Sequence, residues 1–132
     1  MATIPADYRD LFERESFASF ATVMPDGTPQ VTPVWIDYDG EHVLVNTAEG
    51  RQKERNVRSN PRVGLVVLDP EDPYRYVSIR GEVIEVTQDG AVEHIHELTR
   101  RYMNLERYPN LEEEDGPRVL LRIRPERVVT SG

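Results

Sequence analysis

The sequence is poor in several residue types that carry chemistry: of its 132 residues none is cysteine, one is lysine and three are histidine. Without cysteine the chain can form no disulfide, no thiolate metal site and no thiol nucleophile. It also has no run of about 18 apolar residues, so no segment is expected to cross a membrane as a helix. The first residues lack the basic and apolar blocks of a signal peptide, and we expect a cytoplasmic protein.

Motifs of a self-sufficient catalytic site are missing as well. The five serines lie outside any Gly-x-Ser-x-Gly elbow, and the chain has neither a Gly-x-Gly-x-x-Gly fingerprint nor a Gly-Lys-[Ser/Thr] phosphate loop. His94 and His96 are two residues apart, roughly 200° around a helix, so they cannot share one metal ion. No metal site is expected. The chemistry would then come from a bound cofactor, with the protein supplying binding and orientation.

Positive charge is scarce overall but concentrated in one stretch. The formal net charge is −8, which argues against nucleic acid as a partner because phosphate backbones require a basic face. Between residues 47 and 61, however, a glycine turn leads into a short helix that carries Arg51, Lys53, Arg55 and Arg58. Unpaired N–H groups and basic side chains at a helix start favour an anionic group. This stretch is therefore the predicted anion site.

The remaining pattern is that of a mainly β protein. Asp-Gly turns at residues 26–27 and 39–40 separate runs rich in β-branched and aromatic residues, which is a strong hairpin signal. No linker or repeat is visible, and residues 1–132 are expected to form one domain. Strands joined by tight turns favour an antiparallel barrel with peripheral helices. We predict strands over 17–24, 29–38, 42–47, 63–68, 74–87 and 118–129, helices over 5–15, before Pro61 and from Asp89, and a solvated acidic loop at 112–115.

Three ordered motifs give the chain a family resemblance. They are Asp26-Gly27-x-Pro29-x-Val31-x-Pro33-Val34-Trp35, Gly50-Arg51-x-Lys53-x-x-Asn56 followed by Pro61-Arg62-Val63, and Tyr76-Val77-x-Ile79-x-Gly81-x-Val83. In this order they resemble the split β-barrel flavin/deazaflavin oxidoreductases, the superfamily that contains pyridoxamine 5′-phosphate oxidase. The resemblance is closer to the branch that uses the deazaflavin coenzyme F420, and it covers nearly the whole chain.

The resemblance implies a six-stranded antiparallel split β-barrel like that of FMN-binding proteins, and a homodimer with two equivalent cofactor sites at the subunit interface. It also implies an oxidoreductase that transfers a hydride between reduced coenzyme F420 and a small organic acceptor. Arg51 and Lys53 would bind the cofactor phosphate, and Asn56 would orient the turn that carries them. Tyr76 and Tyr102 are candidates to approach the site from the partner subunit. The cofactor ring would be lined by Gln30, Thr32, Val34, Thr47 and Ala48.

Two alternatives remain open. The first is a flavoprotein that binds flavin mononucleotide (FMN) on the same barrel. Pyridoxamine oxidase activity itself is not expected, because the strand around Val34 and Trp35 lacks that enzyme's FMN-positioning basic residues and the chain lacks its C-terminal arginine–histidine pair. The second alternative is a non-catalytic protein that binds flavin or haem, for which His42, His94 and His96 are the available imidazoles. Trp35 is expected in a core or dimer contact rather than as a stacking platform.

Overall fold

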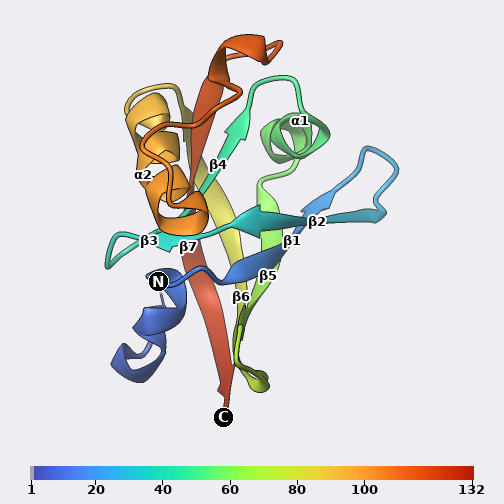
Figure 1. Ribbon diagram of the computed structural model, residues 1–132. Coiled ribbons are helices and arrows are strands. Elements are labelled where there is room, and N and C mark those ends of the chain that lie inside the picture. Colours follow the sequence, from blue (N-terminus) through green and yellow to red (C-terminus); the bar gives the residue numbers. More distant parts are fainter. Residues whose placement is uncertain (1) are drawn as a thin grey trace.

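The sheet of this protein is antiparallel throughout and curls into an open barrel (Figure 1). The computed structural model describes residues 2–132, and seven strands of these residues form one sheet in the order β2-β1-β5-β6-β7-β4-β3. The predicted mainly β split-barrel class is thereby confirmed. The strands are β1 (Phe17–Val23), β2 (Pro29–Trp35), β3 (Asp37–Tyr38), β4 (Val43–Ala48), β5 (Arg62–Asp69), β6 (Asp72–Thr87) and β7 (Arg118–Ser131).

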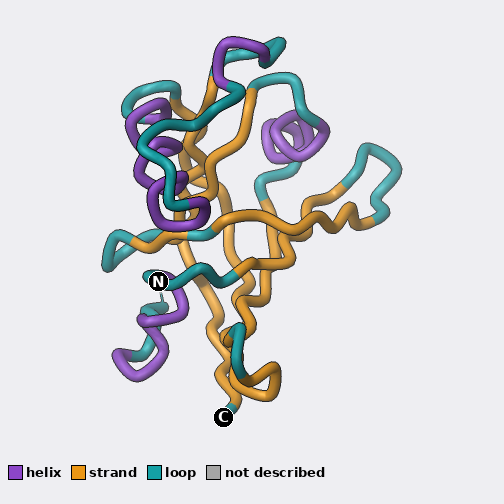
Figure 2. Tube along the Cα trace, in the orientation of Figure 1, coloured by secondary structure: helices purple, strands orange, loops and turns teal. Residues whose placement is uncertain are grey.

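Helices lie at the periphery of the sheet (Figure 2). A 3₁₀ helix, η1 (Ala6–Phe12), takes the place of the longer helix predicted over 5–15. The helix α1 (Gln52–Ser59) follows β4, α2 (Ala91–Met103) follows β6, and the single turn η2 (Leu111–Glu113) precedes β7. Gly90, at φ 75°, rather than Asp89 caps the start of α2. None of the helices within residues 2–132 is long and apolar enough to span a membrane.

The extra strand arises because the segment predicted as one strand over 29–38 divides at the buried residue Ile36. Its first part, β2, pairs with β1, and its second part, β3, pairs with β4. These two pairings lie at opposite edges of the sheet, so the chain around Ile36 is where the edges meet. In the sheet of residues 2–132, β2 and β4 are not hydrogen-bonded to each other. The barrel is therefore split between them.

The core fills the inside of the curl and follows the two-residue period of the strands. In β1, Ala18 and Phe20 are buried whereas Phe17 and Ser19 are exposed. The same alternation along the other strands explains why short β-branched runs form this sheet. The largest buried side chains of the cluster are Phe12, Phe20, Ile4, Leu11, Ile36, Ile79, Leu121 and Ile123.

Pro125 lies in a part of β7 that pairs with a single neighbouring strand. β7 pairs with β4 over residues 118–123, so at Pro125 its partner in the sheet of residues 2–132 is β6. Gly81 of β6 faces Pro125, and the pairing register shifts between Arg80 and Gly81. A Cβ on Gly81 would lie 2.5 Å from the carbonyl oxygen of Arg124, so only glycine fits this bend. Glu126 of β7 is the extra residue between the pairs Arg80–Arg127 and Gly81–Pro125, so the bulge lies in β7 beside this glycine.

Candidate functional site

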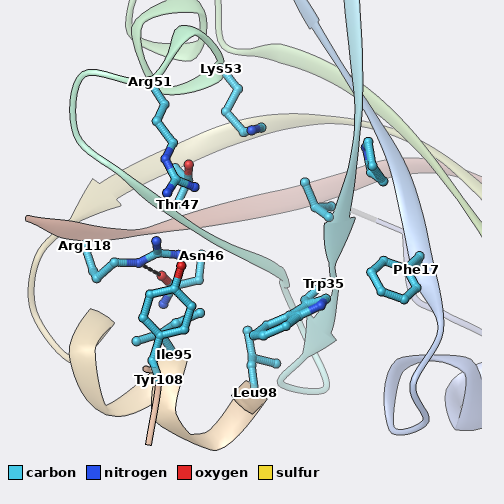
Figure 3. Close-up of a pocket in the computed structure, with 12 residues that line it drawn as sticks. Phe17, Trp35, Asn46, Thr47, Arg51, Lys53, Ile95, Leu98, Tyr108 and Arg118 are labelled. Atoms are coloured by element: carbon cyan, nitrogen blue, oxygen red, sulfur yellow. Dashed lines mark hydrogen bonds between the residues drawn. The ribbon is translucent and has the colours of Figure 1, made fainter. Parts of the chain in front are cut away.

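A pocket of about 190 Å³ opens where β2 and β4 diverge (Figure 3). It is bounded by β2, the end of β4, the start of α1, one face of α2 and the start of β7. Its wall combines three cations, two polar residues, and a set of aromatic and aliphatic side chains. The lining residues are Arg51, Lys53, Arg118, Asn46, Thr47, Phe17, Trp35, Tyr108, Pro33, Val34, Ile95 and Leu98.

The turn between β4 and α1 presents two of the cations. Gly50 allows the turn with a φ of 94°, and its N–H donates to the buried carboxylate of Glu54, 2.9 Å away. This fixes Arg51 at the N-cap of α1 and Lys53 in the first turn. Burial, followed by the nearby charges of Arg51 and Arg118, lowers the pKa of Lys53 below its ordinary value. An anion bound among the three cations would offset this repulsion.

Arg118, the third cation, is buried and held from three sides. Its Nε donates to Oδ1 of Asn46 at 2.9 Å, and its Nη1 donates to Oε2 of Glu114 at 2.9 Å. Its guanidinium lies over the ring of Tyr108, 5.1 Å from the centroid. Burial is the main cause that lowers the pKa of Arg118 below its ordinary value. Sequence reasoning missed this residue, because only the pairing of β4 with β7 brings residue 118 beside residue 48.

Glu114 corrects the prediction of a uniformly solvated acidic loop. Its side chain is only 10% exposed, whereas Glu112, Glu113 and Asp115 are exposed. Its Oε2 accepts hydrogen bonds from Arg118 and from Nη2 of Arg51, the latter at 2.7 Å. It also accepts one from the hydroxyl of Tyr108 at 3.2 Å. One acid of the four therefore belongs to the cation cluster.

Buried hydroxyl groups near the pocket are left without partners. Thr47 is 1% exposed and lines the pocket, and its Oγ1 has no hydrogen-bond partner among the described residues. Oγ1 of Thr32 on β2 is also buried and has no hydrogen-bond partner among residues 2–132, although Thr32 does not line the pocket. A buried polar group left unpaired costs about 1–3 kcal/mol, so a bound polar ligand is the natural partner for Thr47.

The donor set fits the cofactor class that the sequence predicts. Arg51, Lys53 and Arg118 suit a phosphate, because guanidinium and ammonium groups form charge-assisted hydrogen bonds with its oxygens. The apolar side of the same pocket suits a flat ring. Trp35 there stacks on Tyr102, with ring centroids 4.9 Å apart and planes 11° from parallel.

The structure brings together some of the predicted site residues and separates others. Val34, Thr47, Arg51 and Lys53 line the pocket. Ala48 is buried directly beside it, at the end of β4 and opposite Arg118. The remaining predicted residues, Gln30, Thr32, Asn56 and Tyr76, lie outside the wall.

Asn56 and Gln30 belong to a polar network that attaches α1 to the first hairpin. Nδ2 of Asn56 donates to Oγ1 of Thr22 at 3.0 Å, and that hydroxyl donates to Oε1 of Gln30 at 3.1 Å. Both Asn56 and Thr22 are buried. Asn56 thus attaches the helix that carries Lys53 to the first hairpin.

The two tyrosines predicted to reach a neighbouring site have different environments. Tyr76 lies on β6 opposite Leu68 and Ser131, away from this chain's own pocket. The hydroxyl of Tyr102 accepts from the backbone N–H of Ile36 at 3.0 Å and donates to the carbonyl oxygen of Ser16 at 2.5 Å. Within its own chain Tyr102 therefore stacks on Trp35 and is fixed by these backbone hydrogen bonds.

The histidines offer little to a metal. Nε2 of His94 pairs with Oδ2 of Asp37 at 2.9 Å, and its Nδ1 accepts from Nδ2 of Asn46 at 3.1 Å, so both ring nitrogens are engaged. Burial alone would raise the pKa of Asp37, but hydrogen bonds from His94 and Arg101 outweigh it and hold that pKa below its ordinary value. Nδ1 of His96 accepts from the backbone of Tyr108. Within residues 2–132 no group of three potential ligands could hold a metal ion.

Comparisons with known proteins agree with this fold. The family model described as pyridoxamine 5′-phosphate oxidase matches residues 4–132. A solved protein named F420 reductase is 37% identical, with 96% of this chain and 98% of that chain covered and a TM-score of 0.83. A conserved hypothetical protein of Mycobacterium tuberculosis is 26% identical over 99% of this chain and 86% of its own, with a TM-score of 0.75.

The fold extends to more distant proteins. HupZ of Group A Streptococcus is 20% identical, covers 96% of this chain and 93% of its own, and has a TM-score of 0.70. At that identity the likeness shows the fold alone. The family match over residues 4–132, together with the split barrel and the 37% identical neighbour, shows that this chain belongs to the pyridoxamine 5′-phosphate oxidase superfamily of split β-barrels, near its F420 branch.

Proposed function

We propose that this chain is an oxidoreductase that transfers a hydride between reduced coenzyme F420 and a small organic acceptor. The observation that carries the proposal is the pocket between β2 and β4, in which three cations face an apolar, aromatic wall. The 37% identical neighbour named F420 reductase supports this choice of coenzyme within the superfamily. FMN is the second candidate, because its phosphate and ring would use the same two sides of the pocket.

The residues of the pocket would divide the work of binding. Arg51, Lys53 and Arg118 would hold the phosphate of the coenzyme, and the hydroxyl of Thr47 would pair with a polar atom of the ring. The bound coenzyme supplies the hydride chemistry. Hydride transfer depends on close and aligned reactants. An apolar wall that includes Val34 and Trp35 would provide this alignment and exclude water from the reacting face.

The outer face of the sheet supports the proposal that two copies form a dimer. Residues paired across antiparallel strands point to the same face, and the pairings join Phe17 to Trp35 and Val31 to Ala21 on β1 and β2. The same face continues over β5, β6 and β7 with Leu68, Tyr76 and Val129. Large apolar side chains are exposed on it: Val31 at 60%, Phe17 at 57%, Val129 at 50% and Leu68 at 42%.

Such a contiguous apolar surface is unusual on a monomer and is typical of an interface. Phe17 lies on this face and also lines the pocket, so a second copy seated there would complete the pocket wall. Tyr76 of the partner subunit would then approach this site. We therefore propose a homodimer in which each cofactor site lies at the subunit interface.

Titration of the purified protein with coenzyme F420 and, separately, with FMN tests the proposal. Binding would be followed by the absorbance and fluorescence of each coenzyme and by the emission of Trp35, the only tryptophan in the chain. We expect saturable binding of coenzyme F420 with one site per chain. Saturable binding of FMN alone would favour the flavoprotein alternative. Binding of neither coenzyme would contradict the proposal.

Turnover separates the oxidoreductase from a protein that only binds the coenzyme. The reduced coenzyme would be incubated with a panel of quinones, enones and nitroaromatic compounds, and its reoxidation would be followed by absorbance. We expect acceleration with at least one class of acceptor. Tight binding without turnover across the panel would favour the non-catalytic reading.

A further inference from the structure

The carboxylate of Glu114 contacts two members of the cation cluster and lies outside the pocket wall. It contacts Arg51 at 2.7 Å and Arg118 at 2.9 Å through a single oxygen, Oε2. Glu114 itself is not part of the pocket wall, which Arg51 and Arg118 both line. It faces a neighbouring hollow formed by residues 48–51 and 113–116. The two guanidinium groups therefore stand between Glu114 and the pocket.

We propose that Glu114 is a positioning residue of the anion site: it ties Arg51 and Arg118 side by side so that their remaining N–H groups face the pocket. Asn46 and Glu114 together occupy Nε and Nη1 of Arg118, which leaves Nη2 for a ligand. Glu114 occupies Nη2 of Arg51 and leaves its Nε and Nη1. Because two guanidinium groups repel each other, they need a shared anion to stay together before a ligand binds. This inference rests on the proposed function, because it assumes that the pocket holds an anion.

The loop that carries Glu114 is docked against the turn that carries Arg51. The backbone N–H of Glu49 donates to the carbonyl oxygen of Pro117 at 2.8 Å. A Cβ on Gly116 would collide with the carbonyl oxygen of Glu49, so only glycine permits this approach. Tyr108, earlier in the same loop, donates to Glu114 and stacks against Arg118. The loop is therefore part of the site, and its acidic residue has a fixed place in it.

Burial supports a positioning role over a surface ion pair. The side chain of Glu114 is 10% exposed and that of Arg118 is 3% exposed, so water screens their interaction only weakly. The other carboxylate oxygen of Glu114, Oε1, is buried without a hydrogen-bond partner among the described residues. The unpaired Oε1 costs free energy, so the ion pair is better explained by a positioning role than by attachment of the loop alone. The side chain of Arg51, by contrast, is 45% exposed, and it donates a hydrogen bond to Glu114.

The proposal is tested by whether anion affinity rises or falls when the charge of Glu114 is removed. In Glu114→Gln a negative charge near an anion site is lost, and simple electrostatics would strengthen the binding of an anion. Positioning predicts the opposite result: the charge-assisted hydrogen bonds to both guanidinium groups are lost, and affinity for inorganic phosphate falls by about tenfold. Phosphate would be titrated by calorimetry and by the emission of Trp35, which lines the same pocket. Glu113→Gln, the same charge change at the adjacent exposed residue, is the matched control and should leave the affinity within about twofold.

Two further variants separate positioning from a loss of stability. Glu114→Asp keeps the charge but withdraws the carboxylate by one methylene, so we expect weaker phosphate binding here too. In an Arg51→Ala background Glu114→Gln should reduce phosphate affinity by a smaller factor, because one of the two guanidinium groups that Glu114 contacts is already absent. If Glu114→Gln acted only through folding, its effect on affinity would be the same in both backgrounds. Thermal unfolding of each variant would establish that the measurements are made on folded protein.

The outcomes distinguish this inference from the proposed function. If the unaltered protein binds no phosphate, the anion site and the positioning role are both overturned. If it binds phosphate and Glu114→Gln binds it equally or more tightly, the positioning role alone is overturned. Weaker binding in Glu114→Gln and Glu114→Asp, unchanged binding in Glu113→Gln, and a smaller effect in the Arg51→Ala background are the expected results.

Discussion

Replacing Lys53 with alanine should weaken coenzyme binding and leave folding nearly unchanged. Lys53 lines the pocket, and its pKa is lowered by burial and by Arg51 and Arg118. A charge-assisted hydrogen bond to a phosphate contributes about 1.5–3 kcal/mol. At about 1.4 kcal/mol for each factor of ten, this is a loss of about 10- to 150-fold in affinity. The free energy of unfolding should not fall, because the ammonium group is desolvated and repelled by its neighbours in the protein without ligand.

The assay is a titration of Lys53→Ala, Lys53→Met and the unaltered protein with coenzyme F420, monitored by fluorescence. Lys53→Met keeps most of the side-chain volume, so a loss shared by both variants comes from the missing charge. Arg107→Ala removes one positive charge from an exposed residue and serves as the control for net charge. Urea unfolding of each variant checks stability. Unchanged affinity in Lys53→Met would refute the assignment of Lys53 to the phosphate.

Three further predictions concern the lowered pKa values of Lys53 and Asp37 and the exposed apolar face of the sheet. Because the pKa of Lys53 lies below 10.5, phosphate affinity should decline with rising pH before ordinary lysines titrate, and Lys53→Arg should abolish that decline in a calorimetric pH series. The lowered pKa of Asp37 contributes stability that is present above pH 3.8 and is lost as the pH falls through the folded-state pKa. In Asp37→Asn the free energy of unfolding should therefore depend less on pH in acid. At pH 7 the substitution should cost about 3 kcal/mol in urea unfolding. Val31→Asp, on the exposed sheet face, should shift the protein to a monomer in light scattering, while Glu41→Gln, an exposed residue of the β3–β4 turn, should not.

The fold could be predicted because its signals are local. Asp-Gly turns and two-residue alternation mark the hairpins, and Gly81 marks the bulge. The division of β2 from β3 could not be predicted, because residues 29–38 read as one continuous strand and only the closure of the sheet separates its two ends. Pro125 is accommodated because β7 extends past β4 at that point and pairs with β6.

Candidate site residues could be predicted where they are neighbours in the sequence. They could not be predicted where the pairing of strands distant in the sequence brings them together. Arg51 and Lys53 lie in one turn, and their charge stands out on an acidic chain. Arg118 and Glu114 come from the last strand and the loop before it. Nothing in their sequence neighbourhood distinguishes Arg118 from other strand arginines or Glu114 from the acids beside it. Their contacts reach residues more than 60 positions away, as the pairs Glu114–Arg51 and Arg118–Asn46 show.

The junction at Ile36 has a consequence for how a ligand enters. Its N–H donates to Tyr102 and its carbonyl oxygen accepts from Arg101 at 2.8 Å, so the last turn of α2 holds the point where the two edges of the sheet meet. These two side-chain contacts therefore couple the position of α2 to the width of the gap between β2 and β4. A wider opening at the junction would expose the Ile36 amide to solvent. The exchange rate of the Ile36 amide hydrogen would report that opening directly.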